Sequence, residues 1–475
     1  MWVDEYGTWW IVSAPTWSEV TERALKTQGQ SPFYYILVKF FTNFLGEGPF
    51  QLRLPSVIFG IASLALVYPI AMRTFQHRQV ALTAVVVFSL SERLIWYSQN
   101  ARPYALALLL TMLSFLFFHS TAHAKSISHK IGYVLATSLL IYAHFVFCFI
   151  AIIQVIYLIF TKGWRESFSK TWLLPFLCIA FLCLPLTSQL ISLFKRRATL
   201  DWVPYVDRPN IVVQSFLILF DLCHPWIFLV TIAALFSVGF RRNEPHELSR
   251  REGLRLFSWW FIFPFVVFST IPSLLGITLF HPRYLLFTYP AAFFLLAWFM
   301  NHVKPTDWRR WIPTLAFAMS STIFILIPSL GRSGAFSSGS RWDWTDAVRV
   351  LATSAKPTDL IIYRTGLVEA DLFAAGSPKS YLQSYVGWPI IANLPTGHSY
   401  ELVSLPFRLG DHTRAYFVSV AKLASHYNRV WVIGEGELTA LFVKTMISDY
   451  RFRGVHNSSH EKVQVTLLEG TLLGP

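Results

Sequence analysis

Charged residues are scarce in this chain, and that scarcity excludes most classes of soluble protein. Only 14% of its 475 residues are Asp, Glu, Lys or Arg, whereas 54% are hydrophobic and 17% are aromatic. An ordinary soluble domain carries about 25% charged residues. The composition therefore predicts an α-helical polytopic membrane protein.

Cysteine is also rare, and the four cysteines lack the spacing of a metal site. Cys148, Cys178, Cys183 and Cys223 lie in or beside apolar runs, without a CxxC pair. The sequence thus predicts neither a zinc site nor a disulfide framework. The first residues lack the basic patch and apolar core of a secretory signal, so membrane targeting must depend on the spans themselves.

The net charge of +14 would suit a protein that binds nucleic acid. Here, however, Lys and Arg gather in short loops between apolar runs, as topology signals of membrane proteins do. Nucleic acid is therefore not an expected partner, and membrane lipids are.

Long apolar runs define the predicted spans. They lie near residues 55–74, 80–96, 103–118, 131–161, 172–193, 212–240, 256–277, 284–301 and 311–329. Most match the roughly 20 residues that a helix needs to cross a bilayer. The run 131–161 is too long, because one helix of that length would measure about 45 Å against a hydrocarbon core of about 30 Å.

The basic residues favour a break in this run at residues 142–144. With the break, the basic loops after residues 72, 124, 161, 240 and 303 all fall on one face of the membrane. The positive-inside rule then predicts about ten transmembrane helices, with basic loops in the cytoplasm and both chain ends outside. This topology is that of a multi-pass protein of the plasma (inner) membrane.

One basic run, 195–197, falls on the outer face, followed by Trp202, Tyr205 and Arg208. We interpret this loop as resting on lipid headgroups. A docking patch for an anionic acceptor or a carrier phosphate is the alternative.

The pattern changes after residue 330, and predicts a soluble α/β domain over 331–475 on the outer, periplasmic side. A Gly/Ser-rich linker at 331–340 leads to helices at 344–355 and 415–427 and to strands at 359–363, 429–433, 450–456 and 462–468. Residues 434–436 are interpreted as a turn. The remaining chain divides into an outer-face catalytic loop with interfacial helices, 1–54, and a transmembrane core, 55–330.

Three polar segments fall on the outer face when the spans are counted: Asp4-Glu5, 98–104 and 281–284. Polar groups at membrane ends are costly unless they are solvated or act together, so we expect the segments to converge. A solvated terminal tail is the alternative for Asp4-Glu5. A helix packed at headgroup level is favoured instead by the aromatic residues around the pair, which are Trp2, Tyr6, Trp9 and Trp10.

Two arginines on this face, Arg102 and Arg283, have two interpretations. Each could anchor a span end by reaching towards headgroups, or bind a phosphate through paired donors. The two interpretations are evenly balanced. His144, at the break of the long run, is a secondary candidate.

Five segments together, in their order along the chain, resemble a known family: Asp4-Glu5, 31–35, 52–55, 97–104 and 281–284. They are similar to the polytopic glycosyltransferases of the C superfamily, above all the branch of protein O-mannosyltransferases and aminoarabinose transferases. The resemblance covers roughly residues 1–330, and the ordered set is more specific than any single motif.

The resemblance implies transfer of a sugar from a polyprenyl-phosphate carrier to a hydroxyl acceptor (protein, lipid or glycan) outside the membrane. Asp4 would be the catalytic base and Glu5 the second acidic residue, and attack assisted by one carboxylate implies inversion. The matching motifs supply the expected substrate-binding residues Tyr34, Gln99, Arg102, Tyr104, His281, Arg283 and Tyr284, with His144 beside them.

The chain departs from the family pattern in three places. Asn100 stands where relatives often have glutamate, which puts a metal or charge-pairing role in doubt; no cofactor is predicted, with a divalent metal as the alternative. Gln30 precedes Ser31-Pro32, near where relatives carry a histidine. Relatives also have a span before the acidic loop, so we expect either an upstream start or a missing span.

Two further functions stay open. A transporter or flippase for a lipid-linked sugar would also be polytopic, but would place ionisable residues near mid-bilayer, where this chain has few. A catalytically inactive relative is the other alternative.

Overall fold

The computed structural model describes residues 1–27, 31–124, 126–195, 225–239, 248–275, 283–327, 343–376, 379–395, 400–460 and 462–470. The chain forms two compact units, a helical one, Val20–Ser337, and a smaller one that combines Met1–Glu19 with Ser338–Pro475. Residues 1–19 thus group with the C-terminal domain, whereas the sequence pattern had grouped them with residues 20–54.

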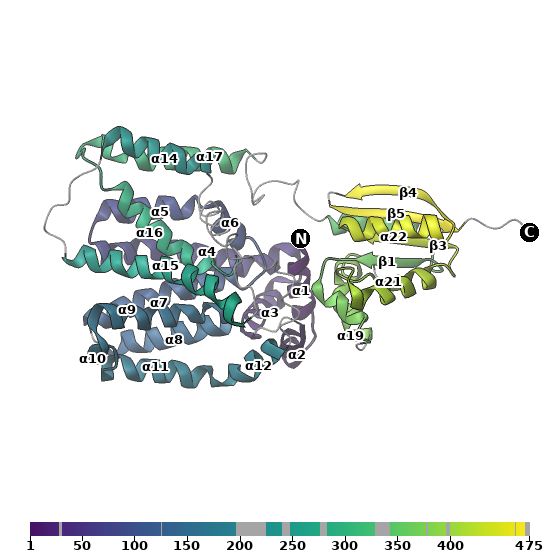
Figure 1. Ribbon diagram of the computed structural model, residues 1–475, viewed down its shortest axis with the longest axis horizontal. Coiled ribbons are helices and arrows are strands. Elements are labelled where there is room, and N and C mark those ends of the chain that lie inside the picture. Colours follow the sequence, from purple (N-terminus) through teal and green to yellow (C-terminus); the bar gives the residue numbers. More distant parts are fainter. Residues whose placement is uncertain are drawn as a thin grey trace, which may run out of the picture. The chain divides into compact units, whose positions relative to one another are not determined.

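The larger unit is built from helices, and most of the longer ones run side by side (Figure 1). They are, in order, α2 (Trp17–Thr27), α3 (Phe33–Leu45), α4 (Pro49–Phe75), α5 (Arg78–Ser89), α6 (Glu92–Ser98), α7 (Tyr104–Ala124), α8 (Ile127–Ala143), α9 (Phe149–Lys162), α10 (Trp164–Ser167), α11 (Lys170–Cys183), α12 (Thr187–Lys195), α14 (Pro225–Val238), α15 (Leu248–Leu275), α16 (Tyr289–Met300) and α17 (Ile312–Leu326). Helix α7 packs against both α4 and α8, and is the most buried of the membrane-length helices.

The long apolar run breaks where the basic loops predicted. Helix α8 ends at Ala143, and His144 adopts an extended backbone with φ −159° and ψ 115°. A 3-10 turn, Phe145–Cys148, then leads into α9. The break leaves His144 between two helices, where its ring can face the interior of the unit.

The run expected as a span over 80–96 is bent into two helices, α5 and α6, which together are apolar and long enough for one broken span. Helices α5 and α6 meet at an angle of 61°. The side chain of Ser91 accepts a hydrogen bond from the Leu94 N–H and caps α6, which gives the new helix its own start. The bend directs the C-terminal end of α6, and the segment 98–104 after it, away from the line of α5.

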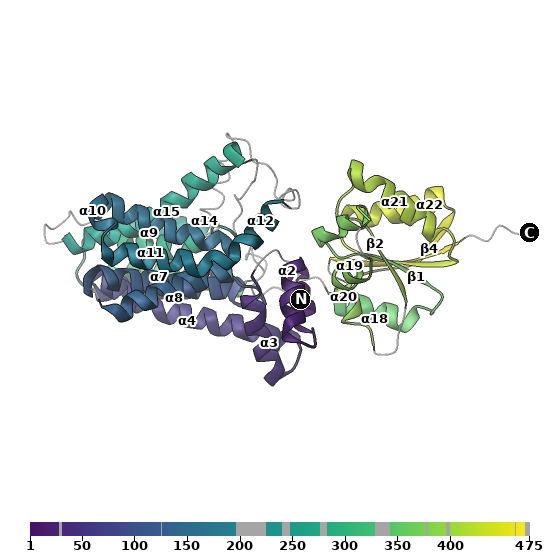
Figure 2. The ribbon, with the colours of Figure 1, turned by 90° about the horizontal axis from the view of Figure 1, so that it is seen from below.

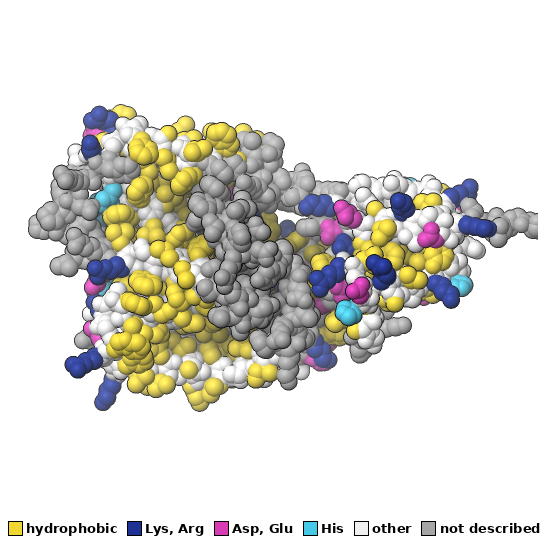
Figure 3. Space-filling model, viewed as in Figure 1, with side chains coloured by type: hydrophobic (Ala, Val, Ile, Leu, Met, Phe, Trp, Pro, Cys, Tyr) yellow, Lys and Arg dark blue, Asp and Glu magenta, His cyan; other side chains and the backbone are white. Residues whose placement is uncertain are grey.

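Among the described residues, four helices are long and apolar enough to cross a membrane, or five if the bent pair is one span. The protein is thus an α-helical polytopic membrane protein, while the count of about ten spans stays a prediction. Figure 3 shows hydrophobic side chains along the flank of this unit and Lys and Arg gathered at one end, where Figure 1 places α10. This segregation is typical of a protein in a bilayer.

The smaller unit contains a five-stranded sheet of order β2-β1-β3-β5-β4. The strands are β1 (Leu360–Arg364), β2 (Glu401–Ser404), β3 (Arg429–Gly434), β4 (Phe452–His460) and β5 (Val463–Gly470). β1 pairs in parallel with β2 and β3, and β5 pairs antiparallel with β3 and β4. This arrangement is that of an α/β domain with an antiparallel hairpin at one edge.

Helices cover both faces of the sheet (Figure 2). α21 (Asp411–Ala424) and α22 (Gly436–Asp449) lie on one face, with a core that includes Phe417 and Phe442. α18 (Trp344–Ser354), α19 (Lys379–Val386) and α20 (Trp388–Ile391) lie on the other face. The predicted helix at 344–355 and four predicted strands are confirmed, whereas β2 was missed because four residues carry too little pattern.

Candidate active site

The segment between α6 and α7 is held in place by polar contacts from α3 and α4. Tyr34 Oη lies 2.9 Å from Ser56 Oγ, and Ser56 Oγ donates to the Arg102 carbonyl at 3.4 Å. Asn100 Nδ2 donates to the Trp96 carbonyl at 2.7 Å. A glutamate at position 100 could not donate this bond, so the departure from the family pattern has a structural role here.

Four of the predicted residues come together from three separate segments. The Tyr104 ring lies 5.5 Å from the His144 ring, which lies 6.2 Å from the Tyr284 ring. Arg283 Cζ lies 5.8 Å from the Tyr284 ring centroid. We call Tyr104, His144, Arg283 and Tyr284 the aromatic–arginine cluster.

His144 is the most informative member of this cluster. Its side chain is 3% exposed, and neither ring nitrogen has a hydrogen-bond partner in the part of the chain that the structure describes. Arg102 and Arg283 lie close enough for their charges to act on the ring. A buried imidazole normally pairs both nitrogens, so this one has free capacity to bind a substrate or water.

Gln99 adjoins an apolar pocket of about 210 Å³. The pocket is formed by side chains of α4, α5, α6 and α7, with Ser98 and Gln99 as its polar residues at the end of α6. Arg102, three residues further along, is 5% exposed. The polar segment 98–104 therefore borders an apolar space in the larger unit.

The acidic pair belongs to the smaller unit, where it forms the first turn of α1 (Val3–Val12). Glu5 is buried, and its Oε2 accepts a hydrogen bond from the Trp2 backbone N–H at 2.9 Å. This bond caps the helix, so Glu5 has a structural role. Asp4 is partly buried in the same turn, where negative charge favours the helix dipole.

The aromatic residues around the pair were expected at headgroup level, and for Tyr6 and Trp10 that expectation was wrong. Each is 1% exposed, buried against α19 and α20 of the soluble domain. Burial raises the pKa of the Tyr6 hydroxyl to about 12, so the group stays protonated at physiological pH. Aromatic side chains suit a protein interface as well as a lipid interface, and the sequence pattern does not separate the two.

Several predicted residues lie outside the described residues. His281 is one, and the basic run 195–197 is another except for Lys195, which ends α12. The same holds for Trp202, Tyr205 and Arg208 and for the linker 331–340. In the described ranges no three His, Cys, Asp or Glu side chains are grouped as metal ligands would be.

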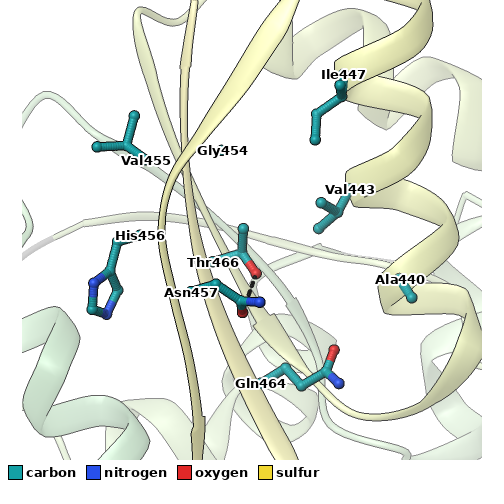
Figure 4. Close-up of a pocket in the computed structure, with 9 residues that line it drawn as sticks. All are labelled: Ala440, Val443, Ile447, Gly454, Val455, His456, Asn457, Gln464 and Thr466. Atoms are coloured by element: carbon teal, nitrogen blue, oxygen red, sulfur yellow. Dashed lines mark hydrogen bonds between the residues drawn. The ribbon is translucent and has the colours of Figure 1, made fainter.

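Two pockets are found among the described residues of the soluble domain. One, of about 390 Å³, lies between α22 and the β4–β5 hairpin, where Thr466 Oγ1 donates to Asn457 Oδ1 at 3.3 Å (Figure 4). The other, of about 700 Å³, is lined by Arg364, Arg408 and Lys444, by the acidic Glu437 and by apolar side chains. None of the residues predicted from sequence lies in either pocket.

The family comparison matches about a third of the chain, within its N-terminal half. Residues 29–191 match the family model described as dolichyl-phosphate-mannose-protein mannosyltransferase. The matched range contains Tyr34, Gln99, Arg102, Tyr104 and His144. No curated protein matches the chain significantly.

Solved structures match almost the whole chain. The apo crystal structure of ArnT from Cupriavidus metallidurans aligns with a TM-score of 0.59 and 12% identity, over 98% of this chain and 93% of ArnT. The chain thus resembles the mannosyltransferase family in sequence over residues 29–191 and ArnT in fold. The structure of the same ArnT bound to undecaprenyl phosphate aligns with a TM-score of 0.54 and 12% identity, over 94% of this chain and 89% of ArnT. At this identity the likeness establishes the fold.

Proposed function

We propose that the protein is an inverting glycosyltransferase that moves a sugar from a polyprenyl phosphate to a hydroxyl acceptor at the outer face of the membrane. The observation that carries the proposal is the aromatic–arginine cluster, assembled from three segments around a buried His144 with unpaired ring nitrogens. The family match over 29–191 and the ArnT fold support the reaction class.

The leaving group determines what the site must supply. A polyprenyl phosphate departs as an anion, so the reaction needs fixed cations more than a strong general acid. Arg102 and Arg283 supply them, since a guanidinium donates paired hydrogen bonds to phosphate oxygens. Tyr104, Tyr284 and the His144 ring then orient the sugar or the phosphate through their polar atoms.

The acceptor hydroxyl must lose a proton as it attacks the anomeric carbon. The new C–O bond forms as the bond to the carrier phosphate breaks, and the proton passes to the Asp4 carboxylate. A single displacement of this kind inverts the configuration at that carbon. Glu5 supports Asp4 by capping the helix on which both stand.

The donor's lipid tail needs apolar surface within the membrane. The apolar pocket beside Gln99 offers such a surface between α4, α5, α6 and α7. The undecaprenyl phosphate in the ArnT structure of the same fold supports a polyprenyl donor. The sugar and the acceptor are left open in this proposal.

The test is an assay of sugar transfer by the full-length protein in membranes, with a labelled polyprenyl-phosphate sugar. We expect release of free polyprenyl phosphate together with a glycosylated product, and a loss of about 10² to 10⁴ in rate for Asp4→Asn. An unchanged rate for Asp4→Asn would show that Asp4 is not the base. Movement of intact donor across vesicles, without release of carrier phosphate, would instead establish a transporter.

A further inference from the structure

The helix that carries the proposed base is part of the soluble unit. Residues 1–19 group with the C-terminal domain, and α1 packs against α19 and α20. We infer that the soluble domain is the positioning element for Asp4, so that domain and base move as one body. This inference rests on the proposed function of Asp4, and it gives the C-terminal domain a direct part in the reaction.

Trp10 is the centre of the docking surface. Its Nε1 donates to Ser384 Oγ at 3.0 Å, and its ring meets those of Tyr381 and Tyr385 edge-on at 5.0 and 5.1 Å. Both tyrosines stand on α19. Such edge-on aromatic pairs add to the stability given by burial, so the C-terminal half of α1 is firmly attached.

A second contact fixes the N-terminal half of α1. Asn393 Nδ2 donates to Tyr6 Oη at 3.0 Å, and Asn393 Oδ1 accepts from Thr345 Oγ1 at 3.1 Å. Nδ2 also donates to the Pro389 carbonyl at 2.8 Å. One amide thus joins α1 to α18 and α20 through three hydrogen bonds, two of them partly buried.

The two contacts together determine the direction in which Asp4 faces. Tyr6 and Trp10 are one turn apart and share a face of α1, whereas Asp4 is rotated about 200° from Tyr6 around the helix axis. Asp4 therefore lies away from the docked face and is partly buried, whereas Thr8, one turn further along on the same side as Asp4, is fully buried. The hydrogen bond from the Trp2 N–H to Glu5 fixes the first turn of α1. The rotation of the helix about its own axis and the position of its N-terminal end are therefore both determined.

Precise placement matters because a base must come within hydrogen-bond reach of the hydroxyl it deprotonates. A displacement of about 1 Å can cost on the order of 10²-fold in rate. Since α1 is attached to the soluble domain, any ligand that shifts this domain shifts Asp4 with it. The domain can thereby couple acceptor binding to the chemical step.

The experiment measures kcat and the donor KM of the full-length protein in membranes, for Trp10→Ala with and without Asp4→Asn. We expect Trp10→Ala to lower kcat by about 10²-fold and to leave the donor KM unchanged. With Asp4→Asn already present, Trp10→Ala should cause no further loss, because the base it misplaces is absent.

Two comparisons separate positioning from damage to the fold. Asn393→Ala should lower kcat, whereas Asn457→Ala, the same change on the β4 edge of the same unit, should not. Trp10→Phe keeps the ring contacts and loses only the hydrogen bond to Ser384, so its effect should be smaller than that of Trp10→Ala. Hydrogen exchange should show faster exchange in α1 of Trp10→Ala, with β1 and β3 still protected.

The inference is overturned if hydrogen exchange shows that α1 of Trp10→Ala has detached from the soluble domain while kcat stays at the wild-type value. It is also overturned if Trp10→Ala causes the same proportional loss in the Asp4→Asn background, since that loss would not act through the base. A wild-type protein that transfers no sugar would refute the proposed function instead. The exchange measurement would in that case still report whether α1 is docked on the domain.

Discussion

Two buried polar side chains, Asp359 in the soluble unit and His144 in the membrane unit, differ in how their polar atoms are paired. In the soluble unit Asp359 is 1% exposed and fully engaged: it accepts from Trp431 Nε1 at 2.9 Å, from the Lys356 N–H at 2.9 Å and from Arg429 Nε at 3.2 Å. In the membrane unit His144 is as deeply buried, with no hydrogen-bond partner among the described residues. A satisfied buried group stabilises a fold, whereas an unsatisfied one keeps hydrogen-bonding capacity for water or a ligand.

The largest effect that this comparison predicts is on the stability of the soluble unit. Asp359→Ala leaves the Arg429 guanidinium and the Trp431 N–H without this acceptor, and should cost about 3–5 kcal/mol in the free energy of unfolding. Hydrogen exchange of β1 and β3 in the full-length protein measures the loss. Asp307→Ala, at an exposed carboxylate, is the control and should stay within about 0.5 kcal/mol. An equal loss of stability in both variants would show that the buried carboxylate of Asp359 contributes no more than the exposed one of Asp307.

The second prediction concerns activity in the membrane unit. Arg283→Gln removes a cation from the aromatic–arginine cluster and should lower kcat by about 10² to 10³, because a departing phosphate loses a fixed donor. The melting temperature should change little. Arg309→Gln, at an exposed arginine paired with Asp307, is the matched control. If both variants lose activity to the same degree, the effect belongs to overall charge and not to the site.

The third prediction is the smallest and separates stability from function at a single residue. His144→Phe keeps the aromatic packing and removes two buried polar nitrogens, so stability should be unchanged or higher by about 1 kcal/mol. Activity should fall, because the ring nitrogens no longer bind the substrate. A thermal shift assay and the transfer assay on the same preparation measure both. A marked loss of stability would show that His144 has a structural partner.

Part of the fold and of the site could be predicted from the sequence. The break at His144 was predicted from the positions of the basic loops, because only a break there puts all of these loops on one face of the membrane. The strands β1, β3, β4 and β5 followed from their periodicity. Segments 98–104 and 281–284 were selected as polar residues at predicted span ends, and the structure brings Tyr104, Arg283 and Tyr284 together.

Other features left no signal that sequence reasoning could use. The bend between α5 and α6 depends on one serine cap inside an apolar run, and β2 is only four residues long. His144 was ranked as a secondary candidate, since nothing in the chain shows that two distant tyrosines flank it. Local pattern reports propensity, whereas these contacts join residues far apart in the chain.

The sequence by itself determined the class of the protein, because the free energy of placing apolar or charged groups in a bilayer depends on composition and order along the chain. Only the tertiary structure decided that Tyr6 and Trp10 dock on the soluble domain and that His144 lies unsatisfied between Tyr104 and Tyr284. Burial and hydrogen-bond satisfaction are properties of packed neighbours, and packing brings those neighbours together from distant parts of the chain.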